Sequence, residues 1–329
     1  MEPIFTFGLE ATRWLQGTFP QLEGFFRFIS ALGQEEFYLI FLPLIYWCWD
    51  KRLGKYLVYV FLFSTGLNAL GKHLLRGPRP YWLDASVGLS HFSDYGVPSG
   101  HTQLTTTIYG FLAGWLKRGW MTWLAIFMIV AMGLSRVFLG VHFVHDVVAG
   151  FLLGLLVLIG FFVWYRYGSE RYNKLILGQK LLWSFVIPVA MAAVYVIGLL
   201  IIGKPNTAVP WAAFIPDAER EGIDAMATAF GALLGFGIGI HLEASRIRFK
   251  VDGPIWQRLV RYVLGLVVTT ALWAGLRVVF PDDPLWLAIP LRVLRYMLVT
   301  LWMSYYGPAL FVRLKLASAS PEPEIKLTL

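Results

Sequence analysis

Three short polar clusters interrupt an otherwise apolar chain, and their residue types suit the binding of an anion. The clusters are KHLLRGPRP at residues 72–80, PSGH at residues 98–101 and SRVFLGVHFVHD at residues 135–146. The first and third contain the cations Lys72, Arg79 and Arg136. An arginine fork donates paired hydrogen bonds to planar or tetrahedral oxyanions, and a lysine adds a mobile point charge. The clusters therefore predict a site for a phosphate-like anion.

The PSGH cluster stands directly before a hydrophobic run of helical length, and it adds backbone donors to this site. Ser99 can cap the helix, and Gly100 lets the backbone approach a ligand closely. The free N–H groups of the first turn form, with the helix dipole, a cradle for phosphate. His101 lies in that first turn, where we expect it to face the bound anion.

His142 and Asp146 complete a set of residues that could catalyse a reaction at phosphorus. They are four residues apart, so on a helix they share one face. A carboxylate on one imidazole nitrogen fixes the tautomer and leaves the other nitrogen free to attack. With His101, the set supplies a nucleophile, a residue that orients it and a general acid without a metal.

The remaining polar residues near the clusters are interpreted as structural or solvated. This applies to three histidines, His73, His91 and His145. A metal site would need convergent carboxylates or cysteines, and the carboxylates near the clusters are Asp84, Asp94 and Asp146. We therefore predict neither a metal nor another cofactor.

The composition indicates that these clusters are positioned by membrane helices. Hydrophobic residues make up 57% of the 329, and the mean hydropathy is +0.63. A span needs about 20 mostly apolar residues. Nine stretches approach this length, at 33–49, 53–75, 99–116, 119–139, 142–165, 181–203, 222–241, 256–280 and 285–313. The expected fold is an all-α, polytopic membrane helical bundle, in which a net charge of +8 does not indicate nucleic acid.

The order of apolar and polar stretches predicts four parts of the chain. They are interfacial amphipathic helices at 1–32, a catalytic transmembrane core at 33–203, a C-terminal transmembrane extension at 204–316 and a disordered tail at 317–329. For residues 1–32, packing against the bundle is an equally open alternative. The extension is expected to hold about three helices. Two roles are open for it, which are to stabilise the core or to form a homodimer, so the oligomeric state is left open.

The distribution of Lys and Arg predicts the orientation. Loops on one side of the nine predicted spans carry 17 of the 28 Lys and Arg residues. By the positive-inside rule that side is cytoplasmic, together with the C-terminus. The N-terminus and all three polar clusters are then extracytoplasmic.

The three clusters resemble the signatures of the type 2 phosphatidic acid phosphatase (PAP2) superfamily, K-x6-R-P, P-S-G-H and S-R-x5-H-x3-D. Every fixed position is present, as Lys72, Arg79 and Pro80, then Pro98 to His101, then Ser135, Arg136, His142 and Asp146. The resemblance implies a six-helix core and a phosphohistidine on His142, which Asp146 orients. It also implies that His101 protonates the leaving oxygen. The phosphoryl oxygens would be bound by Lys72, Arg79, Ser99, Gly100, Ser135 and Arg136.

The leading hypothesis is an integral membrane phosphatase that removes a terminal phosphate from a lipid phosphate or lipid pyrophosphate at the extracytoplasmic face. Its partners would be the lipid bilayer and the phosphorylated lipid. Two alternatives are open. The stretch GPRPYW at 77–82 resembles the glucose-6-phosphatase branch, which favours a soluble sugar phosphate. A non-catalytic lipid transporter or scaffold would use the same residues only to grip phosphate.

Overall fold

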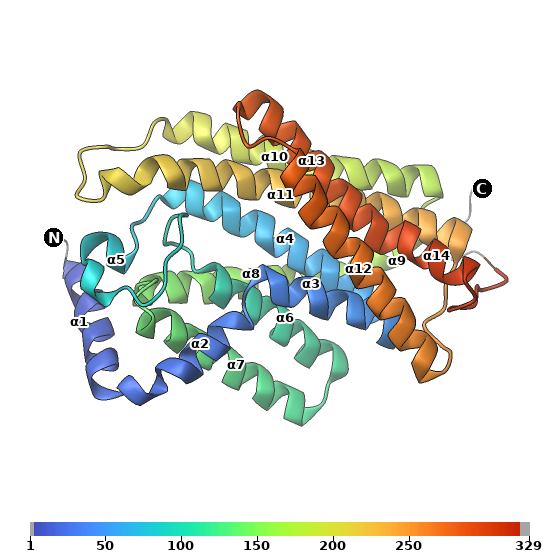
Figure 1. The fold of residues 1–329 in the computed structure, drawn as a ribbon, viewed down its shortest axis with the longest axis horizontal. Helices are drawn as coiled ribbons and strands as arrows, with labels where there is room; N and C mark the ends of the chain where they lie inside the picture. The colour runs from blue at the N-terminus through green and yellow to red at the C-terminus, as the bar shows by residue number, and fades with distance from the viewer. Residues whose placement is uncertain (1–2, 323–329) are drawn as a thin grey trace. The chain divides into compact units, whose positions relative to one another are not determined.

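The computed structural model describes residues 3–322, and its elements are helices (Figure 1). The α-helices are α1 Pro3–Thr18, α2 Glu23–Ala31, α3 Glu35–Leu44, α4 Lys51–Leu75, α5 Pro80–Leu83, α6 Gly100–Leu116, α7 Gly119–Phe138, α8 Val144–Tyr167, α9 Ser169–Asn173, α10 Leu177–Ile202, α11 Ile215–Leu242, α12 Ile255–Val279, α13 Leu285–Leu301 and α14 Gly307–Arg313. Short 3-10 helices cover Pro20–Leu22, Ala85–Val87 and Ala212–Phe214, and π-helical turns cover Ile45–Trp49, Glu243–Ile247 and Trp302–Tyr306. Within the described residues there is no β-strand, which confirms the all-α prediction.

Within residues 3–322, seven helical segments are long and apolar enough to cross a membrane. They are Lys51–Leu83, Gly119–Phe138, Val144–Tyr167, Leu177–Ile202, Ala212–Ile247, Ile255–Val279 and Leu285–Arg313. An eighth span results if Pro20–Ala31 and Glu35–Trp49, which are bent by 53° at their junction, count as one. These segments confirm a polytopic membrane bundle, although with fewer spans than the nine predicted. The stretch predicted at 99–116 forms α6, which has 17 residues and buries five polar side chains in its first two turns, Thr102, Gln103, Thr105, Thr106 and Thr107.

The described chain divides into two compact units. Unit 1 comprises residues 3–38, 63–160 and 195–225, and unit 2 comprises residues 39–62, 161–194 and 226–322. All three polar clusters lie in unit 1. Unit 1 also includes the beginning of α11, although the sequence assigned residues 204–316 to a C-terminal extension.

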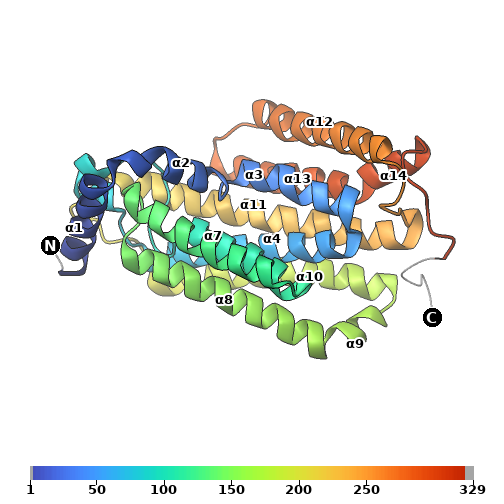
Figure 2. The ribbon, with the colours of Figure 1, turned by 90° about the horizontal axis from the view of Figure 1, so that it is seen from below.

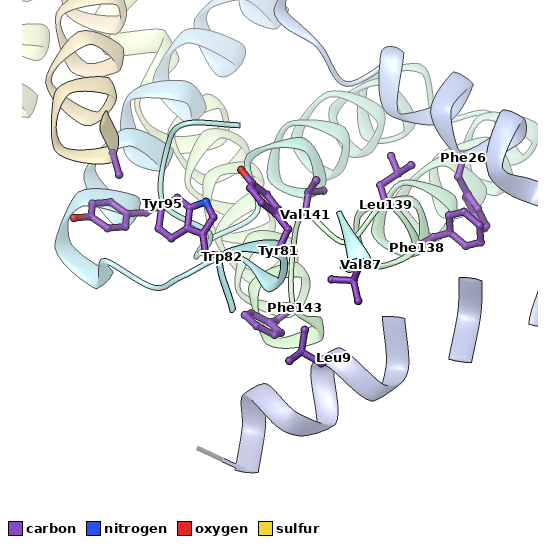
Figure 3. Packing of buried hydrophobic residues seen from close by; sticks show 11 residues of the cluster. Leu9, Phe26, Tyr81, Trp82, Val87, Tyr95, Phe138, Leu139, Val141 and Phe143 are labelled. Atoms are coloured by element: carbon purple, nitrogen blue, oxygen red, sulfur yellow. The ribbon is translucent and has the colours of Figure 1, made fainter. Parts of the chain in front are cut away.

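An aromatic cluster in unit 1 fixes the turn between α7 and α8 (Figure 3). Its buried members are Leu9, Phe26, Tyr81, Trp82, Val87, Tyr95, Phe138, Leu139, Val141, Phe143 and Ala218. Helix α2 lies alongside α7 (Figures 1 and 2), where the rings of Phe26 and Phe138 are 4.7 Å apart. Gly140 adopts φ +67°, and a Cβ there would lie 1.9 Å from the carbonyl oxygen of Val87. The N-terminal helices therefore pack on this turn, and contact of their exposed faces with the membrane interface stays a prediction.

Unit 2 has its own core. Helices α12 and α13 pack against each other (Figure 2), and Trp47 is fully buried against Gly265 of α12. Of the disordered tail predicted at 317–329, residues 323–329 lie outside the described residues. Ahead of them, the N–H of Ser320 donates to the carbonyl of Arg248 at 2.8 Å, so the chain up to this point is joined to unit 2.

Candidate active site

The turn between α7 and α8 holds His142 ahead of the helix rather than on it. Because α8 begins at Val144, the prediction that His142 and Asp146 share a helical face was wrong in its local geometry. The pair forms nonetheless. Asp146 Oδ2 accepts the N–H of Phe143 at 2.9 Å and lies 3.3 Å from His142 Nδ1. The turn thus brings the imidazole back to the first turn of α8.

The environment of His142 favours a neutral, correctly oriented imidazole. The relative exposures of His142 and Asp146 are 1% and 0%. Burial lowers the pKa of His142 well below its usual value, and the charges of Arg79 and Lys72 lower it further. With Nδ1–H donating to Asp146, the lone pair lies on Nε2, which is 3.3 Å from Arg79 Nη1. A neutral imidazole nitrogen therefore lies beside a guanidinium group.

Lys72, at the end of α4, and Arg79, just after it, meet at the carboxylate of Asp94. Lys72 Nζ lies 2.6 Å from Asp94 Oδ2, and Arg79 Nη2 donates to Asp94 Oδ1. Arg79 also donates from Nε to the Asp94 carbonyl at 2.7 Å and from Nη1 to the Val141 carbonyl at 2.8 Å. Burial alone would raise the pKa of the Asp94 carboxyl, but the two cations hold it below its usual value. Asp94 is thus an ionised residue of the site that the sequence did not single out for this position.

Arg136 presents an unused edge of its guanidinium group to the same region. The side chain is fully buried, and its Nη1 donates to Ser30 Oγ at 2.5 Å. Among the described residues, no acceptor lies within hydrogen-bond distance of Arg136 Nε or Nη2, nor of His101 Nε2. The Nε and Nη2 edge is the one that binds an oxyanion through two parallel bonds. Burying these donors without a partner costs free energy, so the geometry favours an anion there.

The start of α6 has the predicted form. Ser99 is its N-cap and accepts the N–H of Thr102, and His101 lies in the first turn. The N–H of Ser99 donates to the carbonyl of Asp146 at 2.9 Å, which ties this helix start to α8. A Cβ on Gly100 would lie 2.9 Å from Asn68 Oδ1, so the close approach that this glycine permits is to α4.

A ladder of buried amides and hydroxyls joins α6 to α4. Gln103 donates to the carbonyl and hydroxyl of Ser64 at 2.8 and 2.9 Å, and it accepts from Asn68 Nδ2 at 2.7 Å. Asn68 Nδ2 also lies 3.3 Å from the carbonyl of Pro98. The ladder therefore holds the PSGH segment at a fixed height along α4, which ends with Lys72.

Gln103→Leu is expected to lower the free energy of unfolding by about 1–3 kcal/mol, because Asn68 and Ser64 lose their partner in a buried setting. Thermal unfolding of both proteins in the same detergent measures the change. The double variant Asn68→Leu, Gln103→Leu should recover part of the stability, since fewer unpaired groups remain. If the double variant lost more free energy of unfolding than Asn68→Leu and Gln103→Leu lose together, this account would be contradicted.

Three further residues from the sequence analysis have their own partners. The resemblance implied Ser135 as a phosphate ligand, whereas His145 and His91 were interpreted as structural or solvated. The hydroxyl of Ser135 donates to the Met132 carbonyl of its own helix at 2.8 Å, away from the remaining candidates. His145 Nε2 lies 3.2 Å from Asp146 Oδ1, and the exposed His91 packs on the ring of Tyr81. Within residues 3–322, no three His, Cys, Asp or Glu side chains are grouped to hold a metal ion.

A second network supports the site from α11. Glu219 accepts from Arg76 at 2.9 and 3.0 Å and from the Tyr95 hydroxyl at 2.8 Å, and His73 Nε2 lies 3.0 Å from it. The Tyr95 carbonyl in turn accepts from Lys72 at 2.8 Å. The first turns of α11 therefore help to position Lys72, although Glu219 lies far away in the sequence.

Two family models match the chain. The model described as the PAP2 superfamily matches residues 53–170, and the model described as PAP2 superfamily phosphatase, transmembrane extension, matches residues 227–319. Together these matches cover more than half of the chain.

Three relatives illustrate the range of similar proteins. Mouse sphingosine-1-phosphate phosphatase 2 is 30% identical over 146 residues, which are 39% of this chain and 38% of that protein. Rat glucose-6-phosphatase 3 is 25% identical over 84% of this chain and 87% of its own length. Lipid phosphate phosphatase delta of Arabidopsis thaliana is 26% identical over 74% of this chain and 60% of its own length. The chain belongs to the PAP2 superfamily, as a multi-pass integral membrane protein related to phosphatases.

Proposed function

We propose that the protein hydrolyses the terminal phosphate of a lipid phosphate or lipid pyrophosphate through a phosphohistidine on His142, without a metal ion. The observation that carries the proposal is the buried Arg136 edge, whose Nε and Nη2 lack an acceptor within residues 3–322. In the same site, His142 Nε2 lies 3.3 Å from Arg79. An anion bound by the arginines would bring phosphorus to a neutral imidazole nitrogen.

The reaction proceeds in two steps. His142 Nε2 attacks phosphorus, and the bond to the leaving oxygen breaks while His101 gives that oxygen a proton. His101 then takes a proton from water as the water attacks the phosphohistidine, the P–N bond breaks and inorganic phosphate leaves. Asp146 stabilises the imidazole in both steps, and the arginines and Lys72 bind the equatorial oxygens.

The lipid substrate is supported by the setting of the site and by two relatives. The site lies at the ends of membrane helices, where a chain embedded in the bilayer can deliver its headgroup. Two matched proteins are named for a lipid phosphate or for sphingosine 1-phosphate. The proposed face is extracytoplasmic, in keeping with the 17 of 28 Lys and Arg residues in loops on the other predicted side.

A second candidate is a soluble sugar phosphate. It is favoured by the match to rat glucose-6-phosphatase 3, which extends over 84% of this chain, against 39% for the mouse sphingosine-1-phosphate phosphatase. The chemistry at phosphorus would be identical. The two candidates differ only in the group that leaves.

The test is phosphate release by the full-length protein in detergent with a metal chelator present. The substrates are phosphatidate, a sphingoid-base phosphate, a polyprenyl pyrophosphate and glucose 6-phosphate, with His142→Ala as the blank. We expect the highest kcat/KM for one of the lipids. Preference for glucose 6-phosphate would replace the lipid by the sugar ester. Phosphate binding without any release would indicate a non-catalytic binder, and loss of activity with the chelator would refute metal independence.

A further inference from the structure

We infer that Asp94 is a specificity-determining residue of this site, because its carboxylate competes with the phosphate of the substrate for Lys72 and Arg79. A terminal phosphate with two charges displaces Asp94, whereas a phosphodiester with one charge does not. The inference rests on the proposed function, since it concerns the choice among phosphate esters at the same site.

The donors of the two cations are almost fully used in the structure. A guanidinium group has five N–H donors and an ammonium group three. Arg79 directs its Nε and Nη2 to Asp94, and its Nη1 lies within 2.8 Å of the Val141 carbonyl and 3.3 Å of His142 Nε2. Lys72 donates to Asp94 and to the Tyr95 carbonyl. One N–H remains on each cation, so neither can bind phosphate through several bonds until the Asp94 carboxylate moves.

Asp94 can leave without unfolding the segment that carries it. The segment is held on both sides: the Phe92 N–H donates to the Tyr81 hydroxyl at 2.9 Å, and the side-chain hydroxyl of Tyr95 donates to Glu219 at 2.8 Å. The Asp94 side chain is 28% exposed, in contrast to 8% for Lys72 and 1% for Arg79. A rotation of this one side chain toward solvent would free one further N–H on each cation, namely the Lys72 and Arg79 Nη2 donors that bind the carboxylate, while Arg79 Nε stays on the Asp94 carbonyl.

Phe92, two residues earlier, lies against two of the three cations of the site, Arg79 and Arg136. Its ring lies 5.2 Å from the Arg79 guanidinium and 4.9 Å from that of Arg136, and its centroid is 5.6 Å from that of His101. The ring gives the two guanidinium groups a favourable cation–π contact and excludes water from them. A ligand must therefore bind the cations more strongly than the Asp94 carboxylate and the Phe92 ring do together.

The charge of the ligand decides this competition. A phosphate monoester carries about 1.5 to 2 negative charges at pH 7 and offers three oxygens, which exceeds what one carboxylate offers. A phosphodiester carries one charge and two free oxygens, so it resembles Asp94 itself. Once Asp94 has moved away, Lys72, Arg79 and Arg136 carry three positive charges, of which a dianion neutralises two and a diester one.

The experiment compares Asp94→Asn with the wild type for two probes, p-nitrophenyl phosphate and its methyl diester, and measures inhibition by inorganic phosphate. In the variant, we expect phosphate to inhibit at a concentration lower by about tenfold, the scale of one charge-assisted hydrogen bond. The preference for the monoester over the diester should fall by a similar factor. Asp94→Glu, which retains the charge, should keep the preference of the wild type.

The matched control is Asp84→Asn, since Asp84 precedes Asp94 by ten residues, is 23% exposed at its side chain, and pairs with Arg13 rather than with Lys72 or Arg79. Its preference and inhibition should equal those of the wild type. Unchanged phosphate inhibition in Asp94→Asn, or weaker inhibition, would overturn the inference. If Asp94→Asn unfolds, phosphate-dependent thermal shifts of Asp94→Ser, a second variant without the charge, are compared with those of the wild type, and phosphate binding no tighter than in the wild type refutes competition. Activity retained in His142→Ala would instead refute the proposed function.

Discussion

His142→Ala is expected to lower kcat by at least about 10³-fold, because it removes the proposed nucleophile rather than a contact that assists it. The imidazole is buried, its Nδ1 lies 3.3 Å from Asp146, and its Nε2 lies 3.3 Å from Arg79 Nη1. Water therefore cannot readily take its place. Protein stability should change little in comparison. The measurement is single-turnover phosphate release from a lipid phosphate with the protein in detergent.

Two further variants separate a nucleophile from a structural histidine. Asp146→Asn should lower kcat by about 10²-fold or more, since the wrong imidazole tautomer then becomes available. His91→Ala, at an exposed histidine of the same unit, should leave kcat within about twofold of the wild type. Acid quenching of the wild type with labelled substrate should lose the protein-bound label, whereas alkaline quenching should retain it on His142. Protein-bound label in His142→Ala, or more than a tenth of the wild-type activity, would rule out this role.

Local sequence determines most of what could be predicted about the fold. Apolar stretches of spanning length do not depend on distant partners, and most of them form the expected helices. The stretch at 99–116 differs because its threonines and Gln103 are buried against other helices of the protein rather than exposed to lipid. Spacing of four residues likewise predicted the pair of His142 and Asp146, but the turn that forms it depends on the contact of Gly140 with Val87.

The residues that the sequence did not reveal are those whose partners are distant. Asp94 has no local sign of its role, since Lys72 and Arg79 reach it from 22 and 15 residues away. Glu219 lies 143 residues from Arg76, between the spans predicted at 181–203 and 222–241, so the sequence indicated only a charged loop residue. Charges in a loop are usually solvated, so the pattern favoured that interpretation. The sequence indicated Asp94 only as one of three carboxylates near the cation clusters, with Asp84 and Asp146.

Gly150→Ala is expected to lower kcat/KM by about 10²-fold, although residue 150 carries no functional group. Glycine at this position lets α8 approach the start of α6. A Cβ would lie 2.4 Å from the carbonyl oxygen of Ser99 and 3.2 Å from its carbonyl carbon. Backbone atoms cannot move aside as the end of a side chain can, so the helices must separate. This would break the bond from the Ser99 N–H to the Asp146 carbonyl and move the phosphate cradle away from His142.

Two other glycines of α8 serve as controls. They separate the effect of displacing Ser99 from the effect of a general loss of stability. A Cβ on Gly160 meets no atom within 4 Å, so Gly160→Ala should keep full activity and gain stability, by up to about 1 kcal/mol. A Cβ on Gly154 would lie 2.8 Å from the Gln103 carbonyl oxygen and from Thr106 Cβ, one turn further from the site. Overpacking there should cost about 1–3 kcal/mol of stability, as at Gly150. Activity should nevertheless fall less in Gly154→Ala, because the bond between Ser99 and Asp146 lies closer to Gly150. Equal losses of kcat/KM in these two variants, measured beside thermal unfolding, would mean that helix separation in general, and not the position of Ser99, limits the reaction.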